Sequence, residues 1–404
     1  MSKPRNRLYL LIIMLFSILP VRGAEAQADS TSYRAETTRW RAAEGQFAGW
    51  QGVGVSLAPD GALRLDRGKA RGEAERYGAG RYRHGGGFVG ETTGPVITTA
   101  FPFSEAVPSW NASTPTGTWL EAQLRVRLGS RWTRWYNLGV WASDPETLAR
   151  HSVSGQADAD AYVDVDTLKL GRRGDPLTAT AYQLKFRLFA RGRDSLPSLT
   201  NAAVAVSTSP TAPTAPAPGN PASWDNLLAV PECSQMVYPD GGEVWCSPTS
   251  VAMVLGYWEG RRGPCESGVR AAVSGVYDSV YEGHGNWPFN AAYAASRGFE
   301  SYVTRFTSMS QAEAWIAAGV PVIISYSWGR GQLTGAPLPA SNGNLAVLAG
   351  FDATGNPVVN DPAAPNNEAV QRTYSRAELE RLWLQGSGGT AYLIYPADRV
   401  VPDL

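Results

Sequence analysis

The residue of this sequence best placed to do chemistry is a cysteine at position 246. Pro248 suits the first turn of a helix, and apolar residues follow at i, i+3, i+4 and i+7 from Val251 to Trp258. A helix is therefore predicted to begin just after Cys246. A thiol at a helix N-terminus lies at the positive end of the helix dipole, which lowers its pKa and favours the nucleophilic thiolate. The position alone also fits a cysteine that packs in the core as a small hydrophobic residue.

The chain has two other cysteines, Cys233 and Cys265. An odd count leaves at least one free thiol or an intermolecular bond. Cys233 and Cys265 could pair, which would close a loop worth about 3–4 kcal/mol in the chain-entropy model and leave Cys246 free.

Four short motifs accompany Cys246 in the C-terminal half of the chain. They read VPECSQM at 230–236, GGEVWCSPTS at 241–250, GNWPFN at 285–290 and VNDPA at 359–363. In this order they resemble cysteine-peptidase family thirty-nine, the bacteriocin-leader peptidases, in its "like" branch, over residues 224–400. The resemblance implies a papain-like α+β fold and a peptide or protein as the substrate or ligand.

The same resemblance implies roles for four positions. Cys246 would be the nucleophile, Gln235 would line the oxyanion hole, and Asp361 would orient the general base. The base itself, a histidine in a Gly-His-Leu strand of the family, falls on position 344, where this chain has Asn344. An amide cannot accept a proton from a thiol near neutral pH, and losing a triad member costs about 10⁴–10⁶-fold in rate.

Only three histidines occur in the sequence. His84 and His151 lie in the N-terminal half, and His284 precedes the third motif. His284 is expected to be a solvated loop residue; the alternative is that it reaches the cleft and replaces the missing base. Cys246 must stay free whether the protein is an active peptidase or a pseudo-peptidase, so Cys233 and Cys265 are predicted to pair if any disulfide forms.

The elements that hold these residues fall into two unlike halves. From about residue 40 to residue 206, polar and apolar residues alternate, which predicts antiparallel strands and an all-β sandwich domain over 29–206. The clearest alternation is at 120–128, 136–142 and 182–188. The only helix that this half suggests is a short one near 33–43. Residues 207–223 are mostly Pro, Ala, Ser and Thr, which predicts a semi-rigid linker.

Residues 224–404 have a mixed pattern that predicts an α+β domain. Capping boxes at Ser310 and Ser375 indicate two helices besides the one at Cys246, with Gly319 and Gly386 as stops. Short β-rich runs alternate with them, at 321–328, 345–351, 357–360 and 391–395. Residues 352–355 lie between two of these runs and suggest that the runs form a hairpin.

The start of the chain is typical of an export signal. Lys3, Arg5 and Arg7 precede an apolar run from Leu8 to Leu19, and small residues alternate at 24–28. The run is shorter than the roughly 20 residues that cross a bilayer. We expect a signal peptide over 1–28, and a secreted or otherwise extracytoplasmic mature chain without a transmembrane segment.

Composition indicates which classes of binding partner to expect. Basic and acidic residues balance at 36 each, so a nucleic-acid partner is not expected.

The run at 156–166 carries carboxylates that could ligate calcium. It lacks the glycine and the terminal glutamate of an EF-hand, so a solvated acidic strand or turn is expected there. No metal or other cofactor is predicted. Tryptophan-rich patches at 110–119 and 132–141 could stack on sugars or fill the core.

Three hypotheses of function follow. The first is an exported thiol peptidase that uses Cys246, Gln235 and Asp361. The second is a pseudo-peptidase that keeps the fold and binds peptides without turnover, which Asn344 favours. The third is a protein that binds cell-wall glycan through its sandwich.

Overall fold

The computed structural model describes residues 33–74, 86–192, 194–210, 216–261 and 263–403. The predicted signal peptide, residues 1–28, and His84 lie outside the described residues. Residues Tyr33–Leu404 form one compact unit. Within the described part of the chain, no helix is long and apolar enough to cross a membrane.

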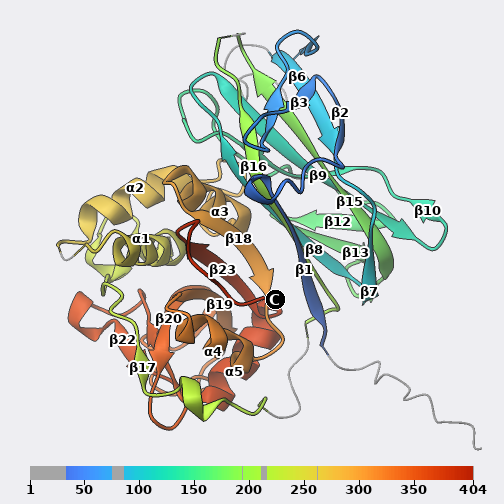
Figure 1. The fold of residues 1–404 in the computed structure, drawn as a ribbon. Helices are drawn as coiled ribbons and strands as arrows, with labels where there is room; N and C mark the ends of the chain where they lie inside the picture. The colour runs from blue at the N-terminus through green and yellow to red at the C-terminus, as the bar shows by residue number, and fades with distance from the viewer. Residues whose placement is uncertain (1–32, 75–85, 193, 211–215, 262, 404) are drawn as a thin grey trace, which may run out of the picture. The chain divides into compact units, whose positions relative to one another are not determined.

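The N-terminal part is a β-sandwich-like domain of two antiparallel sheets (Figure 1). The first sheet contains β1 (Ala35–Arg41), β3 (Val55–Leu57), β4 (Leu63–Leu65), β8 (Glu105–Ser113), β12 (Ala161–Asp164), β13 (Thr167–Arg172), β14 (Asp175–Pro176) and β16 (Ser198–Ser207). The second contains β2 (Gln51–Val53), β5 (Arg71–Glu73), β6 (Gly87–Thr93), β7 (Ile97–Phe103), β9 (Thr118–Leu128), β10 (Arg131–Trp132), β11 (Tyr136–Trp141) and β15 (Ala179–Ala190).

The strand orders place the longest strands at the centre of each sheet. The first sheet has the order β12-β13-β8-β16-β4-β3, with β1 beside β16 and β14 beside β13. The second has the order β10-β9-β15-β6-β2, with β11 beside β9, β5 beside β6 and β7 beside β15. The three alternating segments of the sequence are thus β9, β11 and β15, as predicted.

Two details of this domain differ from expectation. Residues 33–43 form mainly strand β1 and not a helix, because Ala35–Arg41 pairs along its whole length with β16. Alternation predicted one solvated face for β9 and β15, but parts of both strands are buried on the two faces. On the polar face Arg187 and Glu121, each at most 1% exposed, form an ion pair of 3.0 Å.

The tryptophan-rich patches belong mainly to the core. Trp110, Trp119 and Trp141 are at most 1% exposed, so their rings cannot stack on a sugar. Trp132 and Trp135 remain partly accessible, and the guanidinium of Arg125 lies 4.7 Å from the centre of each ring.

The C-terminal domain mixes strands and helices around one seven-stranded sheet. Its strands are β17 (Asn226–Leu227), β18 (Glu300–Arg305), β19 (Val322–Trp328), β20 (Ser341–Phe351), β21 (Pro357–Asn360), β22 (Gln371–Thr373) and β23 (Thr390–Tyr395). Their order is β18-β23-β19-β20-β21-β22, all antiparallel, with β17 beside β20. The four predicted β-runs are β19, β20, β21 and β23, and β20 and β21 form the predicted hairpin.

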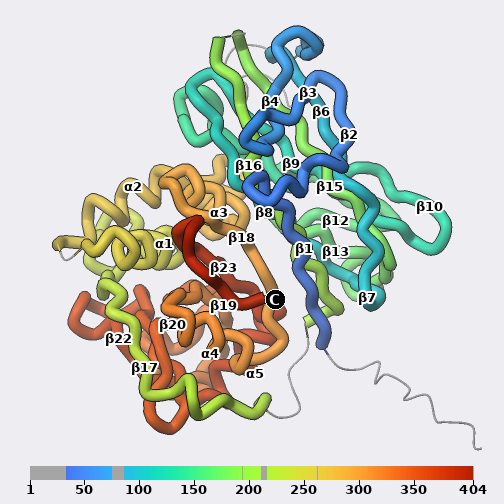
Figure 2. Tube along the Cα trace, viewed as in Figure 1, coloured from blue at the N-terminus to red at the C-terminus, as the bar shows by residue number. Residues whose placement is uncertain are grey.

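In the part of this domain that the structure describes, five α-helices flank the sheet in two groups. They are α1 (Cys246–Trp258), α2 (Glu266–Val276), α3 (Trp287–Ser296), α4 (Met309–Ala317) and α5 (Arg376–Ser387). Successive strand residues face opposite groups: Ile323 and Val347 lie in one core cluster with α1–α3, and Ile324 and Leu348 lie in another with α4 and α5. The sheet therefore lies between two helical layers, which can be followed in the tube of Figure 2.

The two predicted capping boxes have different outcomes. Ser375 caps α5, because its side chain accepts a hydrogen bond from the backbone N–H of Glu378. The helix expected from Ser310 begins instead at Met309, with Ser308 at its N-cap. Glu313, the supposed partner in that box, is buried, and its carboxylate accepts from Trp224 Nε1 and an Arg376 guanidinium N–H.

The other helix boundaries also correct the sequence analysis. Gly386 lies inside α5, which ends at Ser387 with Gly388 as its C-cap in the left-handed conformation (φ 63°). Helices α2 and α3 were not predicted. The start of α3 carried a signal, since Asn286 is its N-cap and accepts from the backbone N–H of Phe289, and Pro288 lies in its first turn.

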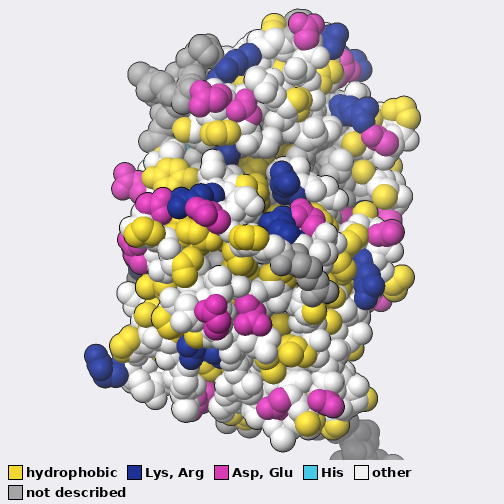
Figure 3. All heavy atoms as spheres, turned by 90° about the vertical axis from the view of Figure 1, so that its left-hand side faces the viewer, with side chains coloured by type: hydrophobic (Ala, Val, Ile, Leu, Met, Phe, Trp, Pro, Cys, Tyr) yellow, Lys and Arg dark blue, Asp and Glu magenta, His cyan; other side chains and the backbone are white. Residues whose placement is uncertain are grey.

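The surface carries charges of both signs. On the face drawn in Figure 3, Lys and Arg side chains lie interspersed with Asp and Glu.

The sandwich and the C-terminal domain share buried contacts. Arg305 Nη1 of β18 lies 2.6 Å from Glu105 Oε2 of β8, in a site where the two side chains are 2% and 11% exposed. The ring of Phe289 packs against Trp110 and Trp141, with ring centres 6.2 and 5.4 Å away. The two domains are thus held by a common core as well as by an ion pair.

Asp166 makes a further contact between the domains. Its Oδ2 accepts a 2.7 Å hydrogen bond from the backbone N–H of Trp287, and its Oδ1 accepts from Thr167 Oγ1 at 3.0 Å. Burial raises the pKa of this carboxyl to about 7, although both hydrogen bonds act in the opposite direction, and the nearby Asp278 raises it further.

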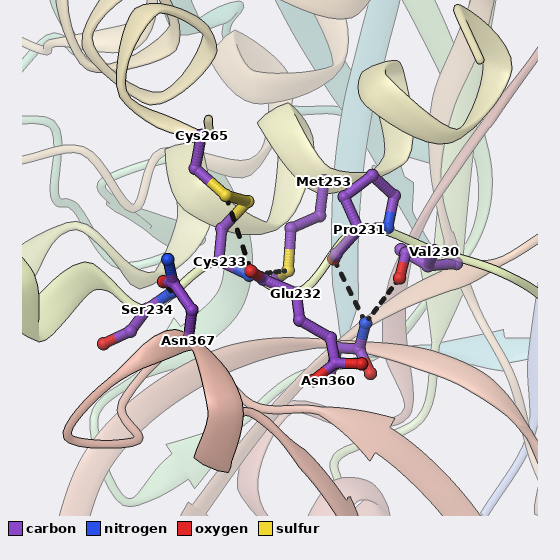
Figure 4. Close-up of a disulfide and its surroundings, with 9 residues drawn as sticks. All are labelled: Val230, Pro231, Glu232, Cys233, Ser234, Met253, Cys265, Asn360 and Asn367. Carbon is purple, nitrogen blue, oxygen red and sulfur yellow. Dashed lines mark hydrogen bonds between the residues drawn. A yellow bond between two sulfur atoms is a disulfide. The ribbon is translucent and has the colours of Figure 1, made fainter. Parts of the chain in front are cut away.

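The predicted disulfide is confirmed. Cys233 and Cys265 are bonded and Cys246 is free. Figure 4 shows how the same segment is held from other sides: the backbone N–H of Cys233 donates to Met253 Sδ at 3.4 Å, and Asn360 Nδ2 donates to the carbonyls of residues 230 and 231, both at 3.2 Å. The first and last motifs of the sequence therefore meet at this disulfide.

Replacing Cys233 and Cys265 together by alanine should lower the free energy of unfolding by about 3–4 kcal/mol, because the unfolded chain loses the constraint of a closed loop. Urea unfolding followed by tryptophan fluorescence measures this difference. Cys246→Ala, which keeps the disulfide, is the matched control. Equal stability of the double variant and the wild type would contradict the stabilising role, and a native, unreduced chain should titrate with a single free thiol.

Asp166 should make the fold less stable as pH rises. Its folded pKa of about 7 lies above the usual value, so the contribution of the protonated carboxyl is complete below about pH 4 and is lost as pH rises through 7. Asp166→Asn imitates the protonated form, and its stability relative to wild type should increase between pH 4 and 8. Asp160→Asn is the opposing control, because its ion pair with Arg131 lowers the pKa of Asp160. Parallel curves for Asp166→Asn and wild type would refute the assignment.

Candidate thiol site

Cys246 is the first residue of α1, as the sequence predicted. It is partly exposed and lines a cavity of about 660 Å³, called here the Cys246 cavity. Two hydrogen bonds fix the first turn of α1 on the sheet: Ser247 Oγ lies 3.0 Å from Tyr392 Oη, and Ser250 Oγ donates to the carbonyl of Leu345 at 3.0 Å. The helix start, and with it the thiol, is set by strands β20 and β23.

The electrostatics of the thiol differ from the expectation for a helix N-terminus. Burial raises the pKa of Cys246, and the charge of Asp361 raises it further, while a hydrogen bond from the Leu345 backbone N–H acts in the opposite direction. The predicted lowering by the helix dipole is thus wrong in its net effect. Desolvation of the thiolate outweighs the favourable dipole, and the neutral thiol is the stable form at neutral pH.

Asp361 follows β21 and is completely buried. Its Oδ2 accepts hydrogen bonds from the hydroxyls of Tyr326 at 2.9 Å and Tyr374 at 2.8 Å. Its Oδ1 accepts from Asn344 Nδ2 at 3.1 Å and from the backbone N–H of Ala363 at 3.0 Å. Burial and the neighbouring carboxylate raise the pKa of both tyrosines, which keeps them as donors.

Asn344 lies on β20 directly opposite Tyr326 of β19. Its Nδ2 donates to Asp361 Oδ1 and to the hydroxyl of Tyr326, both at 3.1 Å. The next residue, Leu345, lines the same cavity as Cys246, and its backbone N–H acts to lower the pKa of the thiol. One strand therefore connects the thiol to the carboxylate, and the amide of Asn344 makes the contact with Asp361 that a family histidine would be expected to make.

Gln235 opens the short helix η3 (Gln235–Val237) and is 3% exposed. Its backbone N–H donates to the carbonyl of Pro362 at 2.9 Å, which places it beside the Asp361 segment. A Cβ at Gly242 would lie 2.0 Å from the Gln235 carbonyl, so this close approach requires glycine in the loop before Cys246. The side-chain Oε1 is buried and has no hydrogen-bond partner among the described residues.

His284 is half-buried and lines the Cys246 cavity, so the expectation of a solvated loop residue is wrong. Its ring packs near Tyr277 and Trp245, with centres 5.1 and 6.2 Å apart. Burial lowers its pKa, and its Nδ1 has no hydrogen-bond partner within the described residues. His151, in contrast, lies in the sandwich with its Nδ1 2.8 Å from the Ser152 carbonyl.

The structure adds one wall to the cavity that the sequence did not indicate. Glu105 and residues Asp164–Thr167 of the sandwich line the same cavity as Cys246. The acidic run at 156–166 is partly the solvated turn that was expected, since Asp158 and Asp160 form ion pairs with Arg134 and Arg131. Its last carboxylate, Asp166, is instead buried against the C-terminal domain, and no local sequence pattern distinguishes it from its neighbours.

His, Cys, Asp and Glu side chains can bind metal ions where several of them lie close together. Over the ranges that the structure describes, no group of three or more His, Cys, Asp or Glu side chains could hold a metal ion.

Family comparisons cover both domains. Residues 36–207 match the model of the peptidase C39 N-terminal domain, and residues 227–391 match that of the Peptidase_C39 like family. No curated protein matches the chain.

Three solved structures show weak similarity. TmCBM61 in complex with β-1,4-galactotriose is 7% identical, with 43% of this chain and 88% of that chain covered and a TM-score of 0.18. A structure of carbohydrate-binding modules from the β-sandwich superfamily is 11% identical, with 42% and 55% covered and a TM-score of 0.16. The CBM32-1, CBM32-2 and M60 catalytic domains of Clostridium perfringens ZmpB are 8% identical, with 91% and 33% covered and a TM-score of 0.16.

This chain thus spans about half of the second structure and a third of the third. TM-scores this low support no conclusion about fold or ligand. The two family models, in contrast, together match most of the chain. They confirm the resemblance inferred from the four motifs: this is a chain similar to the C39-like peptidases, with the N-terminal domain of such a peptidase before it.

Proposed function

We propose that this protein binds peptides in the Cys246 cavity, outside the cytoplasm, and does not cleave them efficiently. In this proposal the C-terminal domain has the papain-like arrangement of a thiol peptidase, with Cys246, Gln235 and Asp361 in the family's positions. The observation that carries it is the amide of Asn344 on the Asp361 carboxylate.

The amide keeps one function of a triad histidine and loses the other. Asn344 Nδ2 donates to Asp361, so the network around the carboxylate is complete without an imidazole. An amide does not take up a proton near neutral pH, so it cannot deprotonate a thiol or protonate a leaving amine. A reaction that needs a general base or general acid at position 344 therefore has none there.

The thiol is also not activated by its surroundings. Burial and the negative charge of Asp361 both raise the pKa of Cys246, so little thiolate is present at neutral pH. A peptidase nucleophile usually has a neighbouring cation that has the reverse effect. His284, which lines the same cavity, has a lowered pKa and is therefore neutral at pH 7.

The Cys246 cavity has features that favour peptide binding, although the site lacks those that catalysis needs. The cavity has a volume of about 660 Å³, which suits a short peptide segment. Gln235 does not line this cavity; its amide oxygen is buried beside the Asp361 segment and has no hydrogen-bond partner among the described residues.

A slow peptidase is the second candidate, and one observation favours it. His284 lines the same cavity as the thiol, and its Nδ1 is free of hydrogen bonds within the described residues. A neutral imidazole there has the chemistry of a general base. The experiments below separate the two candidates.

Wild-type protein incubated with a defined mixture of synthetic peptides should bind a subset of them and leave all intact, as followed by equilibrium dialysis and mass spectrometry. Asn344→His places an imidazole on Asp361 and should raise the cleavage rate by about 10²-fold or more. The same substitution in a Cys246→Ala background is the control and should be inactive.

Cleavage by the wild type that disappears in Cys246→Ala would overturn the non-catalytic proposal. Loss of that cleavage in His284→Ala would then identify the substitute base. If no peptide binds to the wild type, the proposed function fails altogether.

Alkylation of Cys246 by iodoacetamide should show a pH midpoint above the roughly 8.5 of an ordinary thiol, because burial and Asp361 disfavour the thiolate. Asp361→Asn removes one of these causes and should move the midpoint downward. Asp398→Asn, an exposed acid elsewhere on the C-terminal domain, is the matched control. A wild-type midpoint below 7 would show that an unassigned cation activates the thiol.

A further inference from the structure

The turn between β12 and β13 brings the sandwich domain into the Cys246 cavity. Asp164 pairs with Thr167 at the end of the hairpin, and Val165 and Asp166 form the two-residue connection. All four residues line the cavity that contains Cys246. The N-terminal domain therefore contributes part of the surface that a ligand of the thiol site would contact.

Val165 adopts a backbone conformation that valine rarely adopts. Its φ is +59°, and the backbone N–H of Asp166 donates to the carbonyl of Asp164 at 2.8 Å across it. Glycine is the usual residue at the first position of such a tight connection, because a β-branched side chain is strained at positive φ. Strain of this kind persists where the surrounding structure enforces it and is concentrated at functional sites.

The turn cannot move away from the cavity without breaking contacts. The Asp166 carboxylate accepts from the backbone N–H of Trp287, at the first residue of α3, which also lines the cavity. The adjacent end of β8 is held by the buried ion pair of Glu105 with Arg305. The valine side chain is thus held in place on a rigid support before any ligand arrives.

We propose that Val165 is a specificity-determining residue of the Cys246 site: its side chain, fixed by the Asp164–Thr167 turn, limits the size of the group that is admitted beside the thiol. The inference deepens the proposed function and rests on it for the nature of the ligand. It predicts that the cavity selects peptides with small side chains at the position that faces Val165. Asp166 is a positioning residue in this account, because it acts through the turn.

Two thiol reagents of different size test whether Val165 limits access to Cys246, and this test does not depend on peptide binding. Iodoacetamide is small, and iodoacetanilide carries an added phenyl ring with the same reactive group. Val165→Gly removes the isopropyl group and the strain together, so it should raise the alkylation rate of Cys246 by iodoacetanilide by about tenfold relative to iodoacetamide. Because glycine adopts positive φ freely, this variant is expected to fold at least as well as the wild type.

The controls separate size selection from general loosening. Asp225→Gly relieves the same kind of conformation (φ 50°) at a residue that does not line the cavity, and it should leave the ratio of the two rates unchanged. Asp166→Ala should raise the ratio by freeing the turn, and Asp166→Asn, which keeps an acceptor, should restore it.

The outcomes distinguish this inference from the proposed function. An unchanged ratio in Val165→Gly, with Cys246 still alkylated, overturns the role of Val165 and leaves peptide binding intact. A raised ratio in a protein that binds none of the synthetic peptides supports the wall and overturns the proposed function. A raised ratio together with newly bound peptides of larger side chains supports both.

Discussion

A carboxylate that is completely buried must receive hydrogen bonds on all sides, and Asp361 is such a group. Its four donors come from β19, β20, the segment after β21 and the residue that follows β22, so the demand of one charge fixes the relative positions of these elements. The neighbouring residues of the same motif extend the effect. Asn360 and Pro362 bind the chain that leads to Gln235, and the strand that carries Asn344 also contacts the thiol. The site is organised around a charge that itself never meets solvent.

This dependence explains which parts of the site sequence reasoning could reach. The helix at Cys246, the central strands and the free thiol follow from local periodicity, from proline placement and from the number of cysteines. The resemblance located Gln235, Asn344 and Asp361, and the structure brings their segments together. The two tyrosines that hold Asp361 were missed, because Tyr326 meets it only through the register of β19 with β20. The pairing register of two strands cannot be predicted from the sequence of either strand alone.

The errors have the same origin. The sequence suggested a short helix near residues 33–43, where strand β1 lies, because its partner, β16, is more than 150 residues away in the sequence. The net pKa shift of Cys246 was predicted in the wrong direction because a helix dipole is visible in sequence and the burial around the thiol is not. Asp166 looks like any member of an acidic run, yet it faces the backbone of α3. In each case, contacts between segments distant in the sequence determine the structure or the pKa and outweigh the local sequence preference.

The raised pKa of the thiol also bears on how the chain acquires its one disulfide. Cys246 lies in the sequence between Cys233 and Cys265, inside the loop that their bond closes. Exchange between a thiol and a disulfide requires a thiolate as the attacking group. A partly buried Cys246 that keeps its proton is a poor attacker, so once α1 has docked on the sheet the correct pairing is protected from its own third cysteine. The raised pKa that makes Cys246 a weak nucleophile thus also limits its attack on the Cys233–Cys265 bond.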